Sequence, residues 1–176
     1  LLPKRDYEIV EYDASRKTSY RVRKTEIIQS NTLFAPFEIE DDSGSGVVAA
    51  HIAKQFVDNP AVLAVVGHVT SGAMLAAARV YDGNLTAIAT TATTPALTGI
   101  SPWTFRVTSS DSANGVQLAN AVAALGLKRA AILYENDGYG RGLAASFRSA
   151  FRGQVISDDP IRGDISDAEP FISYFK

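Results

Sequence analysis

The chain has 176 residues, 46% of them hydrophobic, which suits a globular domain with a buried core. Its 17 basic and 19 acidic residues give a net charge of −2, so the charge does not favour nucleic acid or another polyanion as a partner. Cysteine is absent and only two histidines occur, which excludes disulfides, cysteine nucleophiles and a histidine-rich metal centre. We therefore expect no metal site and no catalytic thiol.

Residues 1–37 are predicted to form an atypical N-terminal segment. Two stretches within it, YEIVEY and SYRVRKTEII, alternate like half-exposed strands and flank a charged turn at residues 13–17. This pattern predicts an antiparallel β-hairpin.

The next elements predict a strand at residues 37–40 and a helix at about 46–58. In that helix Val48, Ile52 and Phe56 recur every fourth residue beside Ala49, Ala53 and Val57, so one face is expected to be buried. An Asn-Pro pair at residues 59–60 ends the helix.

The stretch from residue 61 to residue 98 predicts a β-α-β unit followed by a polar loop. The valine-rich run at 62–66 predicts a strand covered on both faces in a parallel sheet. Thr70 and Ser71 can cap a helix whose apolar stripe is Met74, Ala77, Ala78 and Tyr81. A second apolar run at 85–89 leads into the hydroxyl-rich loop at 90–95.

Both polar loops follow strands, and the crevice of a parallel sheet lies outside the carboxyl ends of its strands. Ser71, together with backbone N–H groups from Thr70 to Gly72, is a candidate for holding a small carboxylate. The Ala92 carbonyl and the Thr93 hydroxyl are candidates for accepting from an ammonium group, and an α-amino acid carries both groups. The alternative is that Ser71 is only a helix cap and the threonines only a loop.

The remainder of the chain continues the α/β alternation. A strand is predicted at 103–107, then a helix that Asp111 or Ser112 caps and that Gly126 ends as its C′ residue. Further strands are expected at 130–134 and 155–161. Between them lies a helix with Leu143, Phe147, Ala150 and Phe151 on one side, and Asp137 is read as a turn or helix cap. A last helix is expected to begin at Asp167.

Four stretches carry a resemblance to a known family: VVGHVTSG (65–72), TATTPALT (91–98), WTFRVTSSDSANG (103–115) and AAILYENDGYGRGLA (131–145). In these stretches the chain resembles the type I periplasmic binding proteins, in particular the branched-chain amino acid binding proteins of ABC importers. The resemblance covers about residues 38–176. It implies an α/β fold with a parallel sheet flanked by helices in three αβα layers, in which residues 38–153 form the first lobe and residues 154–176 begin the second.

The resemblance also implies a function. The expected protein is a non-enzymatic solute-binding protein of the periplasm or cell exterior that needs no cofactor, with membrane anchoring left open. It would capture a small aliphatic or branched-chain amino acid for an ABC permease. Tyr139 matches the tyrosine that lines the family's ligand cleft, the alternative being a tyrosine packed at a helix start. The family's apolar first strand, glycine loop and long helix are not visible in residues 1–37, and most of its second lobe is not in this sequence, so the exact ligand stays open.

Two other classes of function remain. The same lobe would also serve as the sensing domain of a receptor or regulator. A nucleotide-dependent enzyme is suggested by Gly44, Gly46 and Ala49, which spell G-x-G-x-x-A between a strand and a helix. Asp41 and Asp42 directly before these glycines would repel a pyrophosphate, which disfavours that reading.

Two further residues or features complete the expectations. His68 follows a buried strand, and we read it as a satisfied core or crevice-edge residue in preference to a catalytic one. If the family's first strand is absent, a neighbouring sheet edge is left unpaired, which makes self-association through that edge an open expectation.

Overall fold

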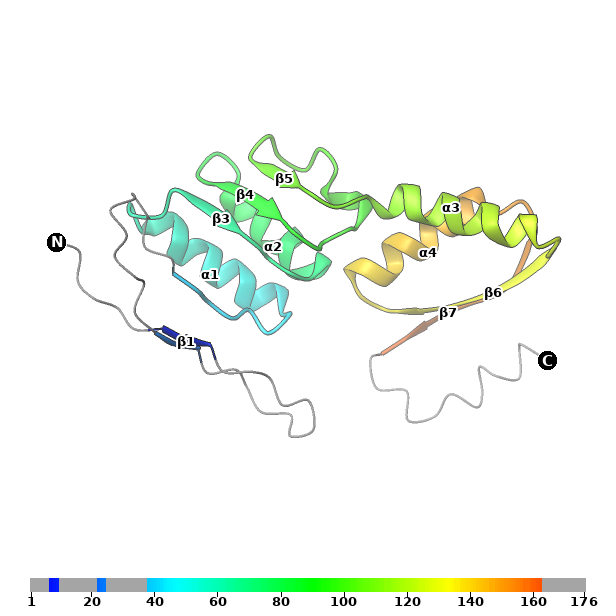
Figure 1. Cartoon of the computed structure of the whole chain (residues 1–176), viewed down its shortest axis with the longest axis horizontal. Coiled ribbons are helices and arrows are strands. Elements are labelled where there is room, and N and C mark those ends of the chain that lie inside the picture. The colour runs from blue at the N-terminus through cyan, green and yellow to red at the C-terminus, as the bar shows by residue number, and fades with distance from the viewer. Residues whose placement is uncertain (1–6, 10–21, 25–37, 163–176) are drawn as a thin grey trace. The chain divides into compact units, whose positions relative to one another are not determined.

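A computed structural model describes residues 7–9, 22–24 and 38–162 of the chain (Figure 1). The chain divides into two compact units, residues 1–39 and 40–176. In the first unit, β1 (Tyr7–Ile9) pairs antiparallel with β2 (Val22–Lys24). The turn predicted at 13–17 and the helix predicted from Asp167 lie outside the described residues, so the hairpin over residues 1–37 stays a prediction.

The second unit alternates helices and strands, as the sequence predicted. Its elements are, in chain order, α1 (Gly46–Asp58), β3 (Ala64–Val66), α2 (Ser71–Tyr81), β4 (Thr86–Ala89), the 3₁₀ turn η1 (Pro95–Leu97), β5 (Thr104–Arg106), α3 (Asp111–Ala124), β6 (Arg129–Glu135), α4 (Gly138–Ala150) and β7 (Gln154–Ile161). All strand pairs within residues 40–162 are parallel: β3, β4 and β5 form one sheet, and β6 and β7 form another. The expected α/β class, with parallel sheets flanked by helices, is confirmed.

The strand predicted at residues 37–40 is wrong for the part that the structure describes. Residues 38–40 are exposed and have no strand conformation. A strand needs a neighbour that accepts and donates its backbone hydrogen bonds, and among the described residues nothing pairs with the outer edge of β3. Asp41 and Asp42 follow, and their carboxylates accept from the backbone N–H groups of Ser43 and Gly44 in a tight turn before α1.

One hydrophobic core lies between the pair α1 and α2 and one face of the β3–β5 sheet. The predicted stripe of α2 is confirmed, because Met74, Ala77, Ala78 and Tyr81 are all fully buried. From α1 the core takes Ala49, Ile52, Ala53 and Phe56, whereas Val48 is exposed. The two helices approach closely at Gly46, where a Cβ atom would lie 3.4 Å from the carbonyl oxygen of Gly72.

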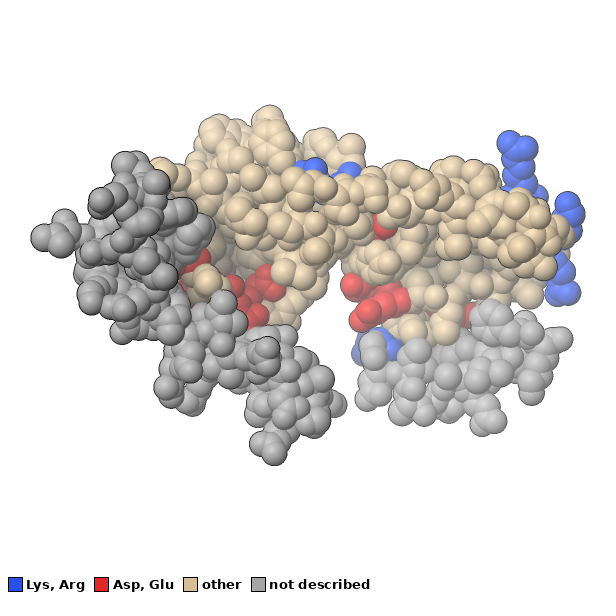
Figure 2. Space-filling view, in the orientation of Figure 1, with Lys and Arg blue, Asp and Glu red and all other residues tan. Residues whose placement is uncertain are grey.

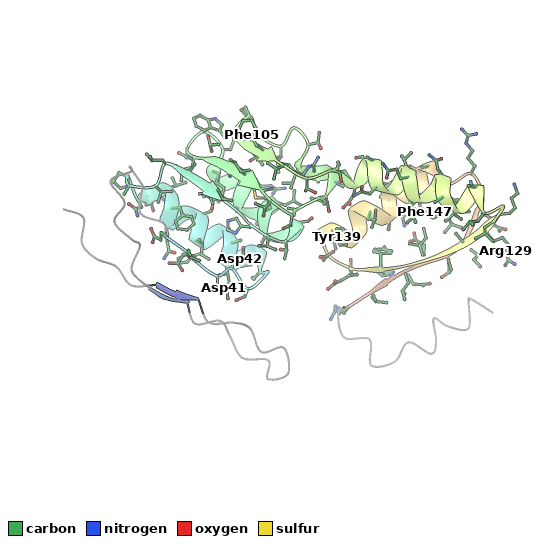
Figure 3. The ribbon with its side chains drawn as sticks, in the orientation of Figure 1. Asp41, Asp42, Phe105, Arg129, Tyr139 and Phe147 are labelled. Carbon is green, nitrogen blue, oxygen red and sulfur yellow. The ribbon has the colours of Figure 1, made fainter. Side chains whose placement is uncertain are left out.

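The opposite face of this sheet is uncovered by the described residues. Val66, Ile88 and Phe105 are neighbours across β3, β4 and β5, and Figure 3 shows Phe105 on the side of β5 away from α1 and α2. Val65 is 7% exposed, but Val66 is 72% exposed and Phe105 54%. The expectation that the run at 62–66 is covered on both faces therefore fails within the described part of the chain.

A second, smaller core joins α3 and α4 to the β6–β7 sheet. Phe147 of α4 and Phe151, the C-cap of that helix, stack with their ring centroids 5.1 Å apart, and both pack near Ala119 of α3. Gly126 has a φ of +74° just beyond the end of α3, as predicted for its C′ residue. The pairing of β6 with β7 joins residues on both sides of the boundary predicted at 153–154.

Candidate functional site

The carboxyl ends of β3 and β4 bring the two predicted polar loops together. The strands are parallel, with Val66 opposite Ile88, so both loops leave the same edge of the sheet. Two hydrogen bonds join them: the Thr91 hydroxyl donates to the Val69 carbonyl at 2.6 Å, and the Thr94 N–H donates to Ser71 Oγ at 3.3 Å. The sheet geometry that the sequence predicted is therefore present.

The first loop ends at the N-terminus of α2. Thr70 is the N-cap, and its hydroxyl accepts from the Ala73 N–H at 3.2 Å while its carbonyl accepts from Met74. No described residue accepts from the N–H groups of Ser71 and Gly72. Unpaired N–H groups at the positive end of a helix dipole suit a carboxylate.

Ser71 is more than a helix residue, because its side chain is 3% exposed and faces the second loop. Its oxygen accepts from the Thr94 N–H, and no described residue accepts its hydroxyl hydrogen. A hydroxyl has one hydrogen to donate. Ser71 therefore retains a donor.

The second loop presents Ala92 and Thr93. Ala92 is buried, and no described residue donates to its carbonyl oxygen. Thr93 is half-buried, its hydroxyl donates to Asp111 Oδ2 at 2.8 Å, and its carbonyl accepts from the Asp111 N–H at 2.9 Å. The Thr93 hydroxyl thus has its hydrogen committed and its oxygen lone pairs left to accept.

Sequence reasoning missed two residues that hold this loop, Arg106 and Asp111. The Arg106 guanidinium donates to the carbonyls of Thr94 at 3.0 Å and Thr93 at 3.4 Å, and also to the Thr98 hydroxyl at 3.1 Å. Asp111 was read as a possible helix cap, but the N-cap of α3 is Ser110, and Asp111 is the first helical residue and is 1% exposed. The sequence carries one signal for them. A basic residue at the end of a strand and an acidic residue at the start of the next helix lie five residues apart.

Tyr139 lies in the first turn of α4, where Figure 3 labels it, and is 46% exposed. Asp137 caps this helix by accepting from the Gly140 N–H at 2.6 Å, as predicted. The neighbouring Gly138 lies against α2, since a Cβ atom at Gly138 would be 3.2 Å from the nitrogen of Gly72. The start of α4 therefore meets the loop that carries Ser71.

A hollow of about 340 Å³ lies beside this meeting point. Its lining residues come from α2, η1 and α4 and are Leu75, Thr94, Pro95, Ala96, Gly138, Arg141, Gly142 and Ala145. None of the six predicted site residues lines it. Thr94, which donates to Ser71, connects the hollow to the predicted site.

His68 is a satisfied core residue, as expected. Its Nδ1 lies 2.5 Å from Asp42 Oδ2 and its Nε2 lies 3.0 Å from the Tyr81 hydroxyl, and the ring is 7% exposed. The network fastens the turn before α1 to the end of α2. Within the described residues, no group of three His, Cys, Asp or Glu side chains is arranged to hold a metal ion.

Tyr81 makes this network sensitive to alkaline pH. Its burial, reinforced by the negative charge of Asp42, raises the pKa of Tyr81 above the usual value near 10. Unfolded Tyr81 loses its proton above about pH 10 while folded Tyr81 keeps it, so the free energy of unfolding falls there by about 1.4 kcal/mol per pH unit. We expect Tyr81→Phe to remove that slope in urea unfolding between about pH 9 and 11. Identical slopes in the two proteins would contradict the assignment.

The glycine motif before α1 serves helix packing and capping. Figure 2 shows acidic side chains gathered on this part of the surface, where Figure 3 labels Asp41 and Asp42. Asp42 accepts from the Gly44 N–H at 2.8 Å, so a carboxylate already takes a backbone N–H that a pyrophosphate would need. Gly46, as described above, lies against α2.

The sequence matches a family model and a known amino acid binding protein. Residues 36–176 match the family model described as periplasmic binding protein. An amino acid binding protein of Pseudomonas aeruginosa is 34% identical over 113 residues, which cover 62% of this chain and 30% of that protein.

Among the described residues, the helices are too short or too polar to span a membrane.

Solved structures of similar proteins include three whose descriptions name leucine or isoleucine. An ABC transporter substrate-binding protein from Desulfitobacterium hafniense in complex with Leu is 30% identical, with a TM-score of 0.62 over 77% of this chain and 42% of that one. A leucine-binding protein from Thermotoga maritima is 29% identical, with a TM-score of 0.70 over 77% and 40%. A branched-chain amino acid transporter substrate-binding protein from Streptococcus pneumoniae, in complex with isoleucine, is 28% identical with a TM-score of 0.68 over the same shares. The chain spans less than half the length of these relatives.

Proposed function

The chain belongs to the periplasmic binding protein family, and from this premise we propose that it captures a small aliphatic amino acid for uptake through an ABC permease. The family is one of periplasmic binding proteins, so we propose binding without catalysis, in the periplasm or at the cell exterior. The relatives described as binding leucine or isoleucine support an aliphatic ligand.

One observation carries this proposal: the adjoining loops present hydroxyls of opposite hydrogen-bonding character. Ser71 has a hydrogen to donate, and it sits beside the unpaired N–H groups of the α2 N-terminus. Thr93 has lone pairs to accept, beside the carbonyl of Ala92. An amino acid zwitterion carries one group that accepts hydrogen bonds and one that donates them, so it complements both sides.

In this proposal Thr70, Ser71 and Gly72 hold the carboxylate, Ala92 and Thr93 hold the ammonium group, and Tyr139 covers the ligand. The partial exposure of Tyr139 and the contact of its neighbour Gly138 with Gly72 support that last role.

We propose that the boundary between the two lobes lies between β5 and α3. Because β6 pairs with β7 and not with the β3–β5 sheet, we propose that the first lobe ends near β5 and that α3 to β7 belong to the second. The outer edge of β3 has no partner among the described residues, which keeps self-association through this edge as a further proposal.

The test is a ligand panel on the wild-type chain, read by thermal shift and by calorimetric titration. Leucine should raise the melting temperature, since a ligand that binds only the folded state stabilises it. Two relatives of leucine are the controls: 4-methylpentanoate lacks the ammonium group, and isopentylamine lacks the carboxylate. Both should bind at least tenfold more weakly. Stabilisation by NAD or ATP without any response to leucine would contradict the proposal.

A further inference from the structure

We propose that Asp111 is a positioning residue that fixes the direction of the Thr93 hydroxyl and thereby makes the site select ligands with an ammonium group. The inference deepens the proposed function and rests on it. It assigns to Asp111 a part in specificity, although Asp111 is not expected to touch the ligand.

The first step is the direction of one hydrogen bond. The Thr93 hydroxyl donates to Asp111 Oδ2 at 2.8 Å. Because a threonine hydroxyl has a single hydrogen, an oxygen that donates to Asp111 can only accept from anything else. A ligand group that meets Thr93 must therefore be a donor.

The second step is that Asp111 cannot turn away. It is 1% exposed, its backbone N–H donates to the Thr93 carbonyl at 2.9 Å, and its Oδ1 accepts from Asn114 Nδ2 at 3.0 Å. An ionised carboxylate has no hydrogen to donate, so the bond to Thr93 runs in one direction only. The position of Asp111 at the N-terminus of α3 also favours its negative charge.

The third step is the contrast with Ser71. Its oxygen accepts from the backbone N–H of Thr94, which cannot reverse its role either, so the Ser71 hydrogen remains for the ligand. Two neighbouring hydroxyls are thus set in opposite directions by the protein, one by a carboxylate and one by an amide. A ligand that lacks the ammonium group leaves the lone pairs of Thr93 without a partner, which is how a polar site rejects an analogue.

The decisive variant is Asp111→Asn, which keeps the size of the side chain. If Asn114 continues to donate to the side-chain oxygen of residue 111, the new amide nitrogen faces Thr93 and donates to it. The Thr93 hydrogen is then released toward the ligand. We expect the ratio of the dissociation constants of 4-methylpentanoate and leucine to fall about tenfold from its wild-type value.

Thr93→Val supplies the matched control, because it removes the hydroxyl and keeps the branched shape. Adding Asp111→Asn to Thr93→Val should leave the ligand ratio unchanged. A loss of folding alone would weaken both ligands in parallel, so the ratio separates specificity from stability. Asp111→Asn with an unaltered ratio would overturn the inference and leave the proposed function standing.

A second measurement needs no ligand. The unfolding equilibrium constants of the wild type, the two single variants and the double variant form a double-mutant cycle. We expect Asp111→Asn to change the constant at least fivefold less in the Thr93→Val background, and strictly additive effects would overturn the bond on which the inference depends. A wild-type chain that binds leucine no better than 4-methylpentanoate would refute the proposed function and the specificity claim together, while the cycle still decides the Thr93–Asp111 bond.

Discussion

Gly115→Ala is expected to lower the free energy of unfolding by about 3 kcal/mol, because α3 and α4 meet at this glycine. A Cβ atom there would lie 2.5 Å from Ser146 Cβ and 2.6 Å from the backbone nitrogen of Phe147. Neither atom is the end of a flexible side chain that can rotate away. The helices must separate, and the cluster of Phe147, Phe151 and Ala119 then loses contact. Urea unfolding measures the change.

Gly72→Ala is the control for this prediction. Gly72 also lies in a helix, but nothing is found within 4 Å of the position that its Cβ would occupy. Alanine favours a helix over glycine by up to about 1 kcal/mol, so propensity alone would make both substitutions neutral or stabilising. Equal losses in the two variants would contradict the role of close packing at Gly115.

The helices of this fold were predicted well because their burial repeats within the sequence itself. Met74, Ala77, Ala78 and Tyr81 lie on one face at helical spacing whatever packs against them, and Gly126 marks its helix end through its positive φ. Strands gave less. Val65 and Val66 are adjacent and chemically identical, and only the layers around the sheet decide that one is buried and the other exposed.

The candidate site was also predicted only in part. The meeting of the Ser71 and Thr93 loops follows from the rule for carboxyl ends of parallel strands, so the sequence was sufficient to predict it. The roles of Asp111 and Arg106 were not predicted, because their partners are loop atoms that no periodic pattern specifies. An acidic residue in the first turn of a helix has the same sequence signature whether it faces solvent or a buried threonine.

Ser71→Ala is expected to weaken leucine binding at least tenfold, and this is the largest effect on binding that we predict. The variant removes the buried side-chain donor that faces the second loop beside the α2 N-terminus, and a hydrogen bond to a charged group contributes about 1.5–3 kcal/mol. Isopentylamine carries no carboxylate, so its binding should change by less than about twofold. Calorimetric titration of both ligands against both proteins gives the comparison.

Ser71→Ala also leaves the Thr94 N–H without its acceptor, so weaker leucine binding could result from a lost ligand contact or from a displaced loop. A control must distinguish these two causes. Thr91→Val makes that separation, because Thr91 joins the same two loops through its bond to the Val69 carbonyl and is exposed. If the loops were merely held together by these bonds, Thr91→Val would weaken leucine as much as Ser71→Ala does. If the Ser71 hydrogen meets the carboxylate, only Ser71→Ala weakens leucine, and it does so while sparing the amine. Parallel losses in the two variants would therefore assign Ser71 to loop packing alone.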